Sequence, residues 1–423
     1  MENSRRFVGI VSQVHDPIRI GEKDLFFVEG FGNIGLIDTD EGALLFDVGA
    51  RQLGGLFFRS IRSVTSKPIR CIVYSHGHFD HCFGYAPFAE EWTQKGWDAP
   101  RVIAHENVVN RFEKYRMQEP YQEWINSQQF QGILPAGLGE TVPAKETLDP
   151  TILVRGWETY RFTFGGYDLE LHPAWGETDD ALWMYVPERA TVFAGDLFLW
   201  SFPNVGNPFK VQRYPKHWAQ ALRRIIELEP EFLAPGHGGL MKGRENIRNA
   251  LSITAEALEF VHDEVVKRLN EGKWFEQILS EMMDIYPDRF KESPYLQPVY
   301  GCYQFAIHAC YRLYHGWYST GNPSDLFPAK ASAIASEILR IAGKGAEKKF
   351  IARAAQLVAE GSFQMALHML DIVINGGDRS MTKAIRQASS MKEKLLQQIA
   401  RKEPSFIARN IYLSAARNNT KEH

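Results

Sequence analysis

The pattern of apolar positions changes about halfway along the chain. In the first half, short apolar runs alternate with turn residues, which indicates β-strands. The runs at residues 25–28, 34–37 and 43–46 are separated by glycine, asparagine and aspartate and predict an antiparallel meander. From about residue 246, apolar residues recur at helical spacing, most regularly in 247–269 and 350–374. We therefore predict a mixed α/β part followed by a helical part.

Length and composition indicate a soluble globular protein with two domains. The chain has 423 residues, of which 44% are hydrophobic and 23% charged. The net charge of −3, without a basic block, gives no indication of a nucleic acid or an anionic membrane as partner. We find neither a signal peptide nor a membrane-spanning stretch. The four cysteines form no Cys-x-x-Cys pair, so we expect a cytoplasmic protein.

The segment from Ser75 to His81 carries the strongest chemical signal. It follows a short apolar run that predicts a buried strand, so it lies where α/β folds place their sites. The segment contains three histidines and one aspartate, His76, His78, Asp80 and His81. Imidazole nitrogen and carboxylate oxygen are ligands that zinc prefers. The segment therefore predicts a metal site.

This His-x-His-x-Asp-His segment resembles the signature of the metallo-β-lactamase fold. The resemblance implies an αβ/βα four-layer sandwich with a one- or two-metal hydrolytic site. Later segments agree with it in order: Gly176-Glu177-Thr178, Gly195-Asp196 and Pro235-Gly236-His237-Gly238. Asp47, at the end of an early strand, matches the aspartate that supports the metal loop in such proteins, although a surface turn is the alternative.

The resemblance implies a complete set of metal ligands. One metal is held by His76, His78 and Glu177, the second by Asp80, His81 and His237, and Asp196 bridges the two. His172 is an alternative to Glu177, but it lies five residues earlier within a strand pattern. We expect two zinc ions per chain, with manganese or iron not excluded. The resemblance also implies a metal-bridging hydroxide as nucleophile, with Asp80 in a catalytic role.

The second half resembles the alkylsulfatase branch of the fold, which also uses a glutamate at the position of Glu177. Residues 315–328 resemble the signature of the alkylsulfatase dimerisation domain, and residues 354–370 resemble its tetratricopeptide-like helix pair. The expected division is a catalytic domain at 1–245 and an all-α dimerisation domain at 246–423. The resemblance implies a homodimer.

The segment after Asp196 is the expected substrate side of the site. Asn204 matches the alkylsulfatase pattern there, but the arginine that holds the sulfate has no counterpart, so Lys210 or Arg213 would supply the positive charge. His217 is a candidate general acid, with a helix cap or a surface residue as the alternative. Tyr300 begins a helical stripe that we assign to packing or dimer contact.

We expect a metal-dependent hydrolase that acts on a small ester, in the first place the sulfate ester of an apolar alcohol. The alternatives are hydrolysis of a carboxylic ester, lactone or amide, a mononuclear iron oxygenase, and a non-catalytic scaffold. An insertion at residues 113–150, with aromatic residues such as Tyr121 and Trp124, is expected either to cover the site as a lid or to form a plain surface loop.

Overall fold

The computed structural model describes residues 13–22, 24–130 and 147–421. The chain divides into two compact units, residues 1–127 with 132–316 and residues 128–131 with 317–423. The expected domain boundary between residues 245 and 246 falls inside the first unit, and it stays a prediction. The expected lid or surface loop at 113–150 is helical over 113–117 and 119–129, so an irregular insertion is wrong there, and residues 131–146 lie outside the described residues.

A seven-stranded sheet carries the metal-loop segment. Strands β2 to β4 form the predicted antiparallel meander, β1 adds a further antiparallel strand beside β2, and β4 to β7 run parallel to one another. In the order of the sheet the strands are β1 (Ile18–Ile20), β2 (Leu25–Val28), β3 (Ile34–Thr39), β4 (Gly42–Phe46), β5 (Ile69–Val73), β6 (Arg101–His105) and β7 (Ile152–Val154). Every residue of β4 is buried, as expected for an apolar run at the centre of a sheet covered on both faces.

A six-stranded sheet supplies the later site segments. The pairing is antiparallel except between β11 and β12, which run parallel. In sheet order the strands are β13 (Met241–Lys242), β12 (Phe232–Pro235), β11 (Thr191–Gly195), β10 (Ala181–Val186), β9 (Tyr167–Ala174) and β8 (Tyr160–Phe164). Because β11 and β12 are parallel, the residues that follow them, Asp196 and Gly236, lie at the same edge.

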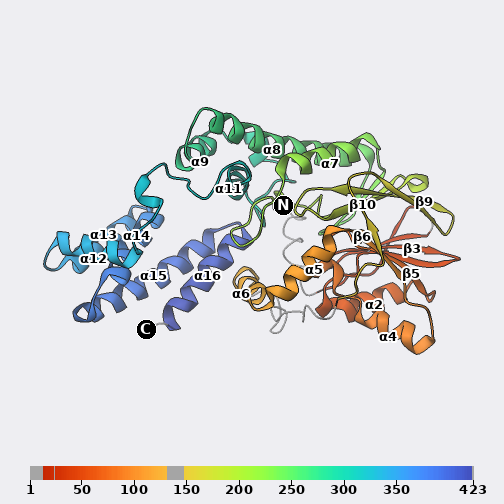
Figure 1. Cartoon of the computed structure of the whole chain (residues 1–423), viewed down its shortest axis with the longest axis horizontal. Helices are drawn as coiled ribbons and strands as arrows, with labels where there is room; N and C mark the ends of the chain where they lie inside the picture. The colour runs from red at the N-terminus through yellow and green to blue at the C-terminus, as the bar shows by residue number, and fades with distance from the viewer. Residues whose placement is uncertain (1–12, 23, 131–146, 422–423) are drawn as a thin grey trace. The chain divides into compact units, whose positions relative to one another are not determined.

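Three apolar cores define four layers in the first unit. One core lies between the two sheets, and a second lies between the seven-stranded sheet and helices α2, α4 and α5. A third packs the six-stranded sheet against α7, α8 and α11, and Figure 1 shows α7 and α8 on the side of β9 and β10. The helices are α2 (Gly54–Arg62), α3 (Phe79–Cys82), α4 (Ala86–Lys95), α5 (Asn107–Met117), α6 (Glu119–Gln129), α7 (Pro215–Glu227), α8 (Arg244–Asn270), α9 (Phe275–Asp284), α10 (Asp288–Lys291) and α11 (Tyr303–Tyr314). The expected αβ/βα sandwich is confirmed.

The second unit is helical from Ala331 onward. It contains α12 (Ala331–Ala342), α13 (Ala346–Ala359), α14 (Phe363–Gly376), α15 (Thr382–Lys402) and α16 (Phe406–Lys421). Helices α13 and α14 bury Ala354, Leu357, Ala366 and Leu370 in one apolar core. This is the pair that the sequence pattern predicted, and the short segment 360–362 joins its members. Among the helices described in the two units, none is long and apolar enough to cross a membrane.

Candidate metal centre and substrate side

Asp47 supports the metal loop, residues 75–81, through contacts with Ser75 and His81. Asp47 Oδ1 accepts a hydrogen bond from the Ser75 backbone N at 2.6 Å, and Oδ2 accepts from Ser75 Oγ at 2.6 Å. The same Oδ2 lies 2.8 Å from His81 Nδ1, so it orients the ring with Nε2 toward the site. Asp47 has φ +65°, a left-handed conformation that aspartate tolerates better than most residues. These contacts agree with the supporting role that the resemblance implied.

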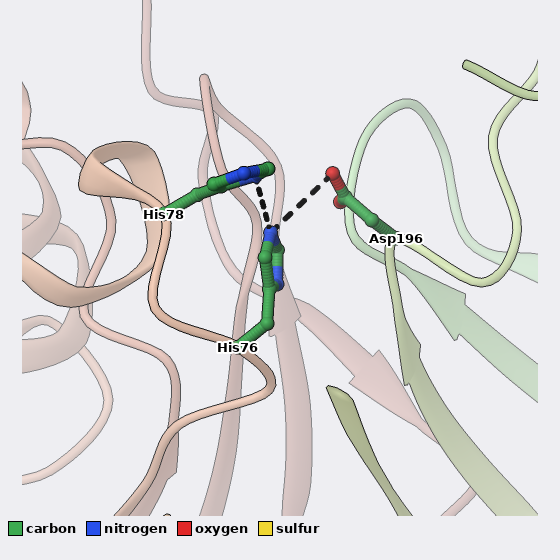
Figure 2. Close-up of side chains that lie close together, drawn as sticks. All are labelled: His76, His78 and Asp196. Carbon is green, nitrogen blue, oxygen red and sulfur yellow. Dashed lines mark hydrogen bonds and ion pairs between the residues drawn. The ribbon is translucent and has the colours of Figure 1, made fainter. Parts of the chain in front are cut away.

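Two groups of three ligand-type side chains meet at the strand ends. The first triad is His76, His78 and Asp196, and the second triad is Asp80, His81 and His237; within each, the candidate ligand atoms lie within 4.8 Å of one another. Figure 2 shows His76 between His78 and Asp196. The structure thus brings together six of the seven residues assigned as ligands.

Asp196 presents one oxygen to each triad. Its Oδ2 lies 3.7 Å from His76 Nε2, and its Oδ1 lies 3.2 Å from His81 Nε2 and 3.5 Å from His237 Nε2. The distances join the two triads through a single carboxylate. This placement is the one that a bridging ligand requires, and the ligand role itself stays a prediction.

The donor set fits divalent cations. His76 Nε2 faces His78 Nδ1 at 2.8 Å, and His81 Nε2 faces His237 Nε2 at 3.4 Å. Two lone pairs that face each other repel unless one nitrogen carries a proton, whereas a cation beside them would use both. Glu177 Oε2 is buried with no hydrogen-bond partner among the described residues, and Asp196 Oδ1 is buried against the imidazole nitrogens of His81 and His237. Carboxylate oxygens in such positions beside imidazoles suit a zinc-like ion.

The electrostatics of the first triad agree with this reading, whereas in the second triad the carboxylates of Asp196 and Asp80 raise the pKa of His81 and of His237 against the effect of burial. Burial, together with the neighbouring His81, lowers the pKa of His76 to about 4, so the ring is neutral near pH 7. Burial likewise lowers the pKa of His78, with help from His76 and Arg111. For Asp196, burial is outweighed by His237, His81 and His76, which lower the pKa of the carboxyl group. Neutral imidazoles and an ionised carboxylate are the protonation states that metal ligation needs.

Glu177 lies beside the triads but belongs to neither. It is buried, its Oε1 accepts a hydrogen bond from Asn204 Nδ2 at 3.0 Å, and it forms an ion pair with Arg213. Burial raises the pKa of Glu177 to about 7, although Arg213 opposes the rise. The third residue of the first triad is Asp196 instead. A metal-ligand role for Glu177 stays a prediction, and its unpartnered Oε2 is the atom that would serve.

The alternative ligand His172 is engaged elsewhere. Its ring stacks on Trp183 at a centroid distance of 3.9 Å, and its nitrogens lie 3.0 Å from Thr159 Oγ1 and 3.1 Å from Glu170 Oε2. Arg224 Nη2 also lies 3.1 Å from His172 Nδ1. His172 is therefore part of a side-chain network on β9, and the structure places Glu177, not His172, next to the triads.

The predicted substrate residues have different surroundings. Arg213 donates to the Asn204 carbonyl at 2.5 Å and pairs with Glu177, so both Asn204 and Arg213 are tied to Glu177. Lys210 Nζ donates to Asn126 Oδ1 of α6 at 3.0 Å. Burial, followed by repulsion from Arg213, lowers the pKa of Lys210 to about 7. No ion pair of Lys210 with a carboxylate occurs in the described part of the chain.

His217 lies at the surface on the first turn of α7. Its ring packs against Trp175 and Tyr214 at centroid distances of 4.9 and 6.1 Å. Burial, with the nearby His262, lowers the pKa of His217. Its contacts are therefore aromatic, and its assignment as a general acid stays a prediction.

Sequence reasoning missed two features next to the site. Tyr300, which we had assigned to packing, is half-buried; burial and the carboxylates of Glu177 and Asp80 raise its pKa well above the ordinary value. The segment that carries Tyr300 is joined to the segment after Asp196 by a backbone hydrogen bond, in which Phe202 N donates to Gln297 O at 3.0 Å. The second feature is a buried pair, Arg111 and Asp180, against the metal loop. No motif marks either of them in the sequence.

Comparisons with known proteins agree with this architecture. Residues 28–237 match the metallo-beta-lactamase superfamily, which defines the class of fold and site described above. Residues 275–422 match the alkyl sulfatase dimerisation family. The resemblance to the alkylsulfatase-like branch of the metallo-β-lactamase superfamily, expected from the sequence, is therefore confirmed.

Named relatives are similar over most of this chain. A linear primary-alkylsulfatase of a Pseudomonas species is 26% identical over 351 residues, 79% of this chain and 65% of the relative. An alkyl/aryl-sulfatase of Saccharomyces cerevisiae is 22% identical over 96% of this chain and 62% of the relative. A solved stereoselective inverting sec-alkylsulfatase from Pseudomonas has a TM-score of 0.80 at 19% identity, over 96% of this chain and 65% of that one, which shows the shared fold. The chain spans somewhat under two thirds of the length of these relatives.

Proposed function

We propose that this protein is a metal-dependent hydrolase that cleaves the sulfate ester of an apolar alcohol. The proposal rests on one observation above all. Lys210, which forms no ion pair with a carboxylate among the described residues, is near enough to the two triads for its charge to interact with His78 and Asp80. Its charge also interacts with that of Glu177, which supports a position of the ammonium group at the edge of the site. An anionic substrate would supply the missing partner.

We assign the metal-holding role to residues of both sheets. His76 and His78 would hold one cation with Glu177 and Asp196, and Asp80, His81 and His237 would hold the other with the second oxygen of Asp196. A pair of divalent cations, zinc in the first instance, would lower the pKa of a water molecule and polarise an ester oxygen. Asp47 fixes the ring of His81, and Arg213 partly opposes the rise that burial causes in the pKa of Glu177.

The substrate would be oriented by charge. The Lys210 ammonium group would pair with the sulfate, while Arg213 balances Glu177 and adds to the positive field on the same side. Asn204 would set the position of Glu177 through its 3.0 Å hydrogen bond. The relatives that are named alkylsulfatases support this choice of substrate class.

A second candidate function is hydrolysis of a carboxylic ester, lactone or amide. This alternative is favoured because Arg213 is already paired with Glu177, so that only Lys210, of the two candidate cations, is left to bind a sulfate group. A lysine binds a tetrahedral oxyanion with less directional contacts than an arginine does. A carboxylic ester needs no such cation. An iron oxygenase and a non-catalytic scaffold stay as lesser alternatives.

Assembly and location also remain proposals. We infer a homodimer formed through the second unit, where several large apolar side chains are exposed: Trp317, Leu326, Phe327, Ile334, Ile341 and Met365. The match to a dimerisation family supports this inference. Light scattering coupled to size exclusion would measure the mass. The four cysteines, all free, fit the cytoplasmic location that we expect.

The decisive experiment combines metal content with sulfate release. We would purify the protein, count the metals per chain, and assay medium-chain alkyl and aryl sulfates. About two metals per chain with sulfate release, lost on chelation and restored by zinc or manganese, is the expected result. Two metals without sulfate release would direct the assay to esters, lactones and amides. A chain that binds no divalent cation would overturn the proposed function.

A further inference from the structure

A buried ion pair between Arg111 and Asp180 links helix α5 to the segment that follows Glu177. Arg111 projects from α5, and Asp180 lies between Glu177 and β10. Arg111 is 8% exposed and Asp180 is fully buried. Arg111 Nε donates to Asp180 Oδ2 at 2.6 Å. Burying two ions is costly, so their interaction offsets that cost only where the geometry of the pair is good.

The Asp180 carboxylate also contacts the metal loop directly. Its Oδ2 accepts a hydrogen bond at 3.2 Å from the backbone N–H of Gly77, the residue between His76 and His78. Gly77 leaves the room for this contact, because a Cβ there would lie 3.0 Å from Asp180 Oδ2 and 2.9 Å from Arg111 Cδ. Asp180 therefore fixes the peptide that carries both histidines of the first triad.

A second bond ties the same two segments. Leu182 N donates to Ser75 O at 2.6 Å, one residue before His76. The metal loop follows a strand of the seven-stranded sheet, whereas Asp180 and Leu182 belong to the six-stranded sheet and the turn that precedes it. The position of the two histidines relative to Glu177 thus depends on these cross-sheet contacts.

We propose that Asp180, held by Arg111, is a positioning residue that sets the affinity of the His76 and His78 side of the site for a divalent cation. The inference rests on the proposed function, since it assumes that these histidines hold a metal. Arg111 balances the charge of Asp180 and aims its Oδ2 at Gly77. Residues that orient metal ligands without touching the metal commonly change affinity by roughly 10- to 100-fold when replaced.

The neighbouring Asp179 offers a matched control. Its Oδ1 accepts from Arg111 Nη2 at 2.6 Å, so it shares the same arginine. Its side chain is 43% exposed, and its carbonyl oxygen accepts from Asn107 Nδ2 on α5. It has the same charge and the same partner as Asp180 but makes no hydrogen bond to the metal loop within the described residues. Asp179→Asn therefore removes equal charge without removing the loop contact.

The test measures cation binding by Asp180→Asn and Asp179→Asn in the full-length protein. Zinc affinity is measured by competition with a chromophoric chelator, and the visible absorption of the cobalt(II)-loaded protein reports the ligand geometry. For Asp180→Asn we expect one of two binding steps to weaken by roughly 10- to 100-fold, with a changed cobalt spectrum. For Asp179→Asn we expect wild-type affinities and spectrum.

Unchanged affinity and spectrum in Asp180→Asn, or equal changes in both variants, would overturn the inference. A purely structural role would lower the melting temperature without altering the cobalt spectrum of the folded protein. If Asp180→Asn does not fold, Arg111→Gln serves instead and is expected to weaken the same step. Absence of metal binding by the wild type would refute the proposed function itself, so the two failures are distinguishable.

Discussion

The guanidinium group of Arg213 and the carboxylate of Glu177 form a buried ion pair that Asn204 closes into a triangle. Asn204 donates to Glu177 Oε1, and its own carbonyl accepts from Arg213 Nη1. Both charged side chains are less than a tenth exposed. Arg213, one of the two residues expected to hold a sulfate, therefore influences the charge state of a predicted metal ligand, because it opposes the rise that burial causes in the pKa of Glu177.

Replacing Arg213 should shift the pH dependence of cation binding. Burial raises the pKa of Glu177 to about 7, and Arg213 opposes that rise. In Arg213→Gln the pKa rises further, so Glu177 is protonated and unable to ligate over a wider range below neutral pH. Zinc affinity measured between about pH 6 and pH 9 should therefore recover only at higher pH than in the wild type. Arg223→Gln, which breaks a half-exposed pair with Glu259, is the control; identical pH profiles for wild type and Arg213→Gln would contradict the prediction.

Lys210 should control the affinity for an anionic substrate in a pH-dependent way. Its pKa is lowered to about 7, so its positive charge is present below that pH and is lost as the pH rises through it. In the wild type, KM for a sulfate ester should therefore rise above about pH 7. Lys210→Met should have a KM higher by roughly tenfold or more at pH 6, with little further rise.

The control for Lys210 is Lys267→Met, which alters an exposed lysine in the last turn of α8. It should keep the KM and the pH profile of the wild type. If Lys210→Met binds the sulfate ester as well as the wild type does, the substrate anion is held elsewhere. An unchanged KM for a neutral carboxylic ester in Lys210→Met would show that the loss concerns charge.

Asp80→Ala should abolish turnover while the fold survives. Asp80 Oδ2 lies 3.3 Å from His237 Nε2 and 3.8 Å from His81 Nε2, so its removal leaves the second triad with two imidazoles. We expect one metal fewer per chain and a fall in kcat of at least roughly 100-fold. Metal analysis, circular dichroism and steady-state kinetics measure these effects. Asp98→Ala, at an exposed position, should change none of them; an active Asp80→Ala protein with normal metal content would refute the assignment.

Gly32→Ala should damage the same triad through the backbone. Gly32 has φ +75°, and a Cβ there would lie 1.7 Å from the carbonyl oxygen of Asp80. The start of α3 would have to move, and the side chains of Asp80 and His81 with it. Gly21 has φ +70°, but its Cβ would meet nothing closer than 3.9 Å. Gly21→Ala therefore carries the same conformational cost, about 1–2 kcal/mol, without the clash.

The two glycine variants separate the effect of backbone strain at the glycine from the effect of displacing Asp80. Both should lower the melting temperature, but only Gly32→Ala should also lose cation affinity and activity. Loss of cation binding in both variants would mean that general destabilisation, and not the position of Asp80, is responsible.

A truncation should locate the boundary between the folding units. Helix α8 buries Ile247, Leu251 and Leu258 in the same core as Trp183 and Trp218. A fragment ending at residue 245 would expose this core, so we expect it to be insoluble. A fragment ending at Gly316 keeps the core and should be soluble, and its mass would test whether dimer formation needs the second unit. A soluble, folded 1–245 fragment would support the boundary that we expected from the sequence.

The sequence by itself determined the class of fold and the chemistry of the ligands. The alternation of short apolar runs and turns predicts the meander and the later strands, because a buried strand needs an apolar side chain at nearly every position. Dense ligand patterns such as His76 to His81 are specific, since few local structures need three imidazoles and a carboxylate in one loop. The resemblance to the metallo-β-lactamase fold, with its agreement in segment order and strand-end context, then assigned Asp196 and His237 to the same group, and the structure brings them together.

Only the tertiary structure decided how the remaining charges are paired. Whether Arg213 faces a substrate or Glu177, and whether Asp180 is a surface acid or the support of Gly77, depends on which side chains meet across the two sheets. Arg111 and Asp180 are 69 positions apart, and no periodicity or motif encodes such a contact. The apolar pattern of a segment predicts which of its own residues are buried. A buried ion pair depends instead on how distant segments pack together.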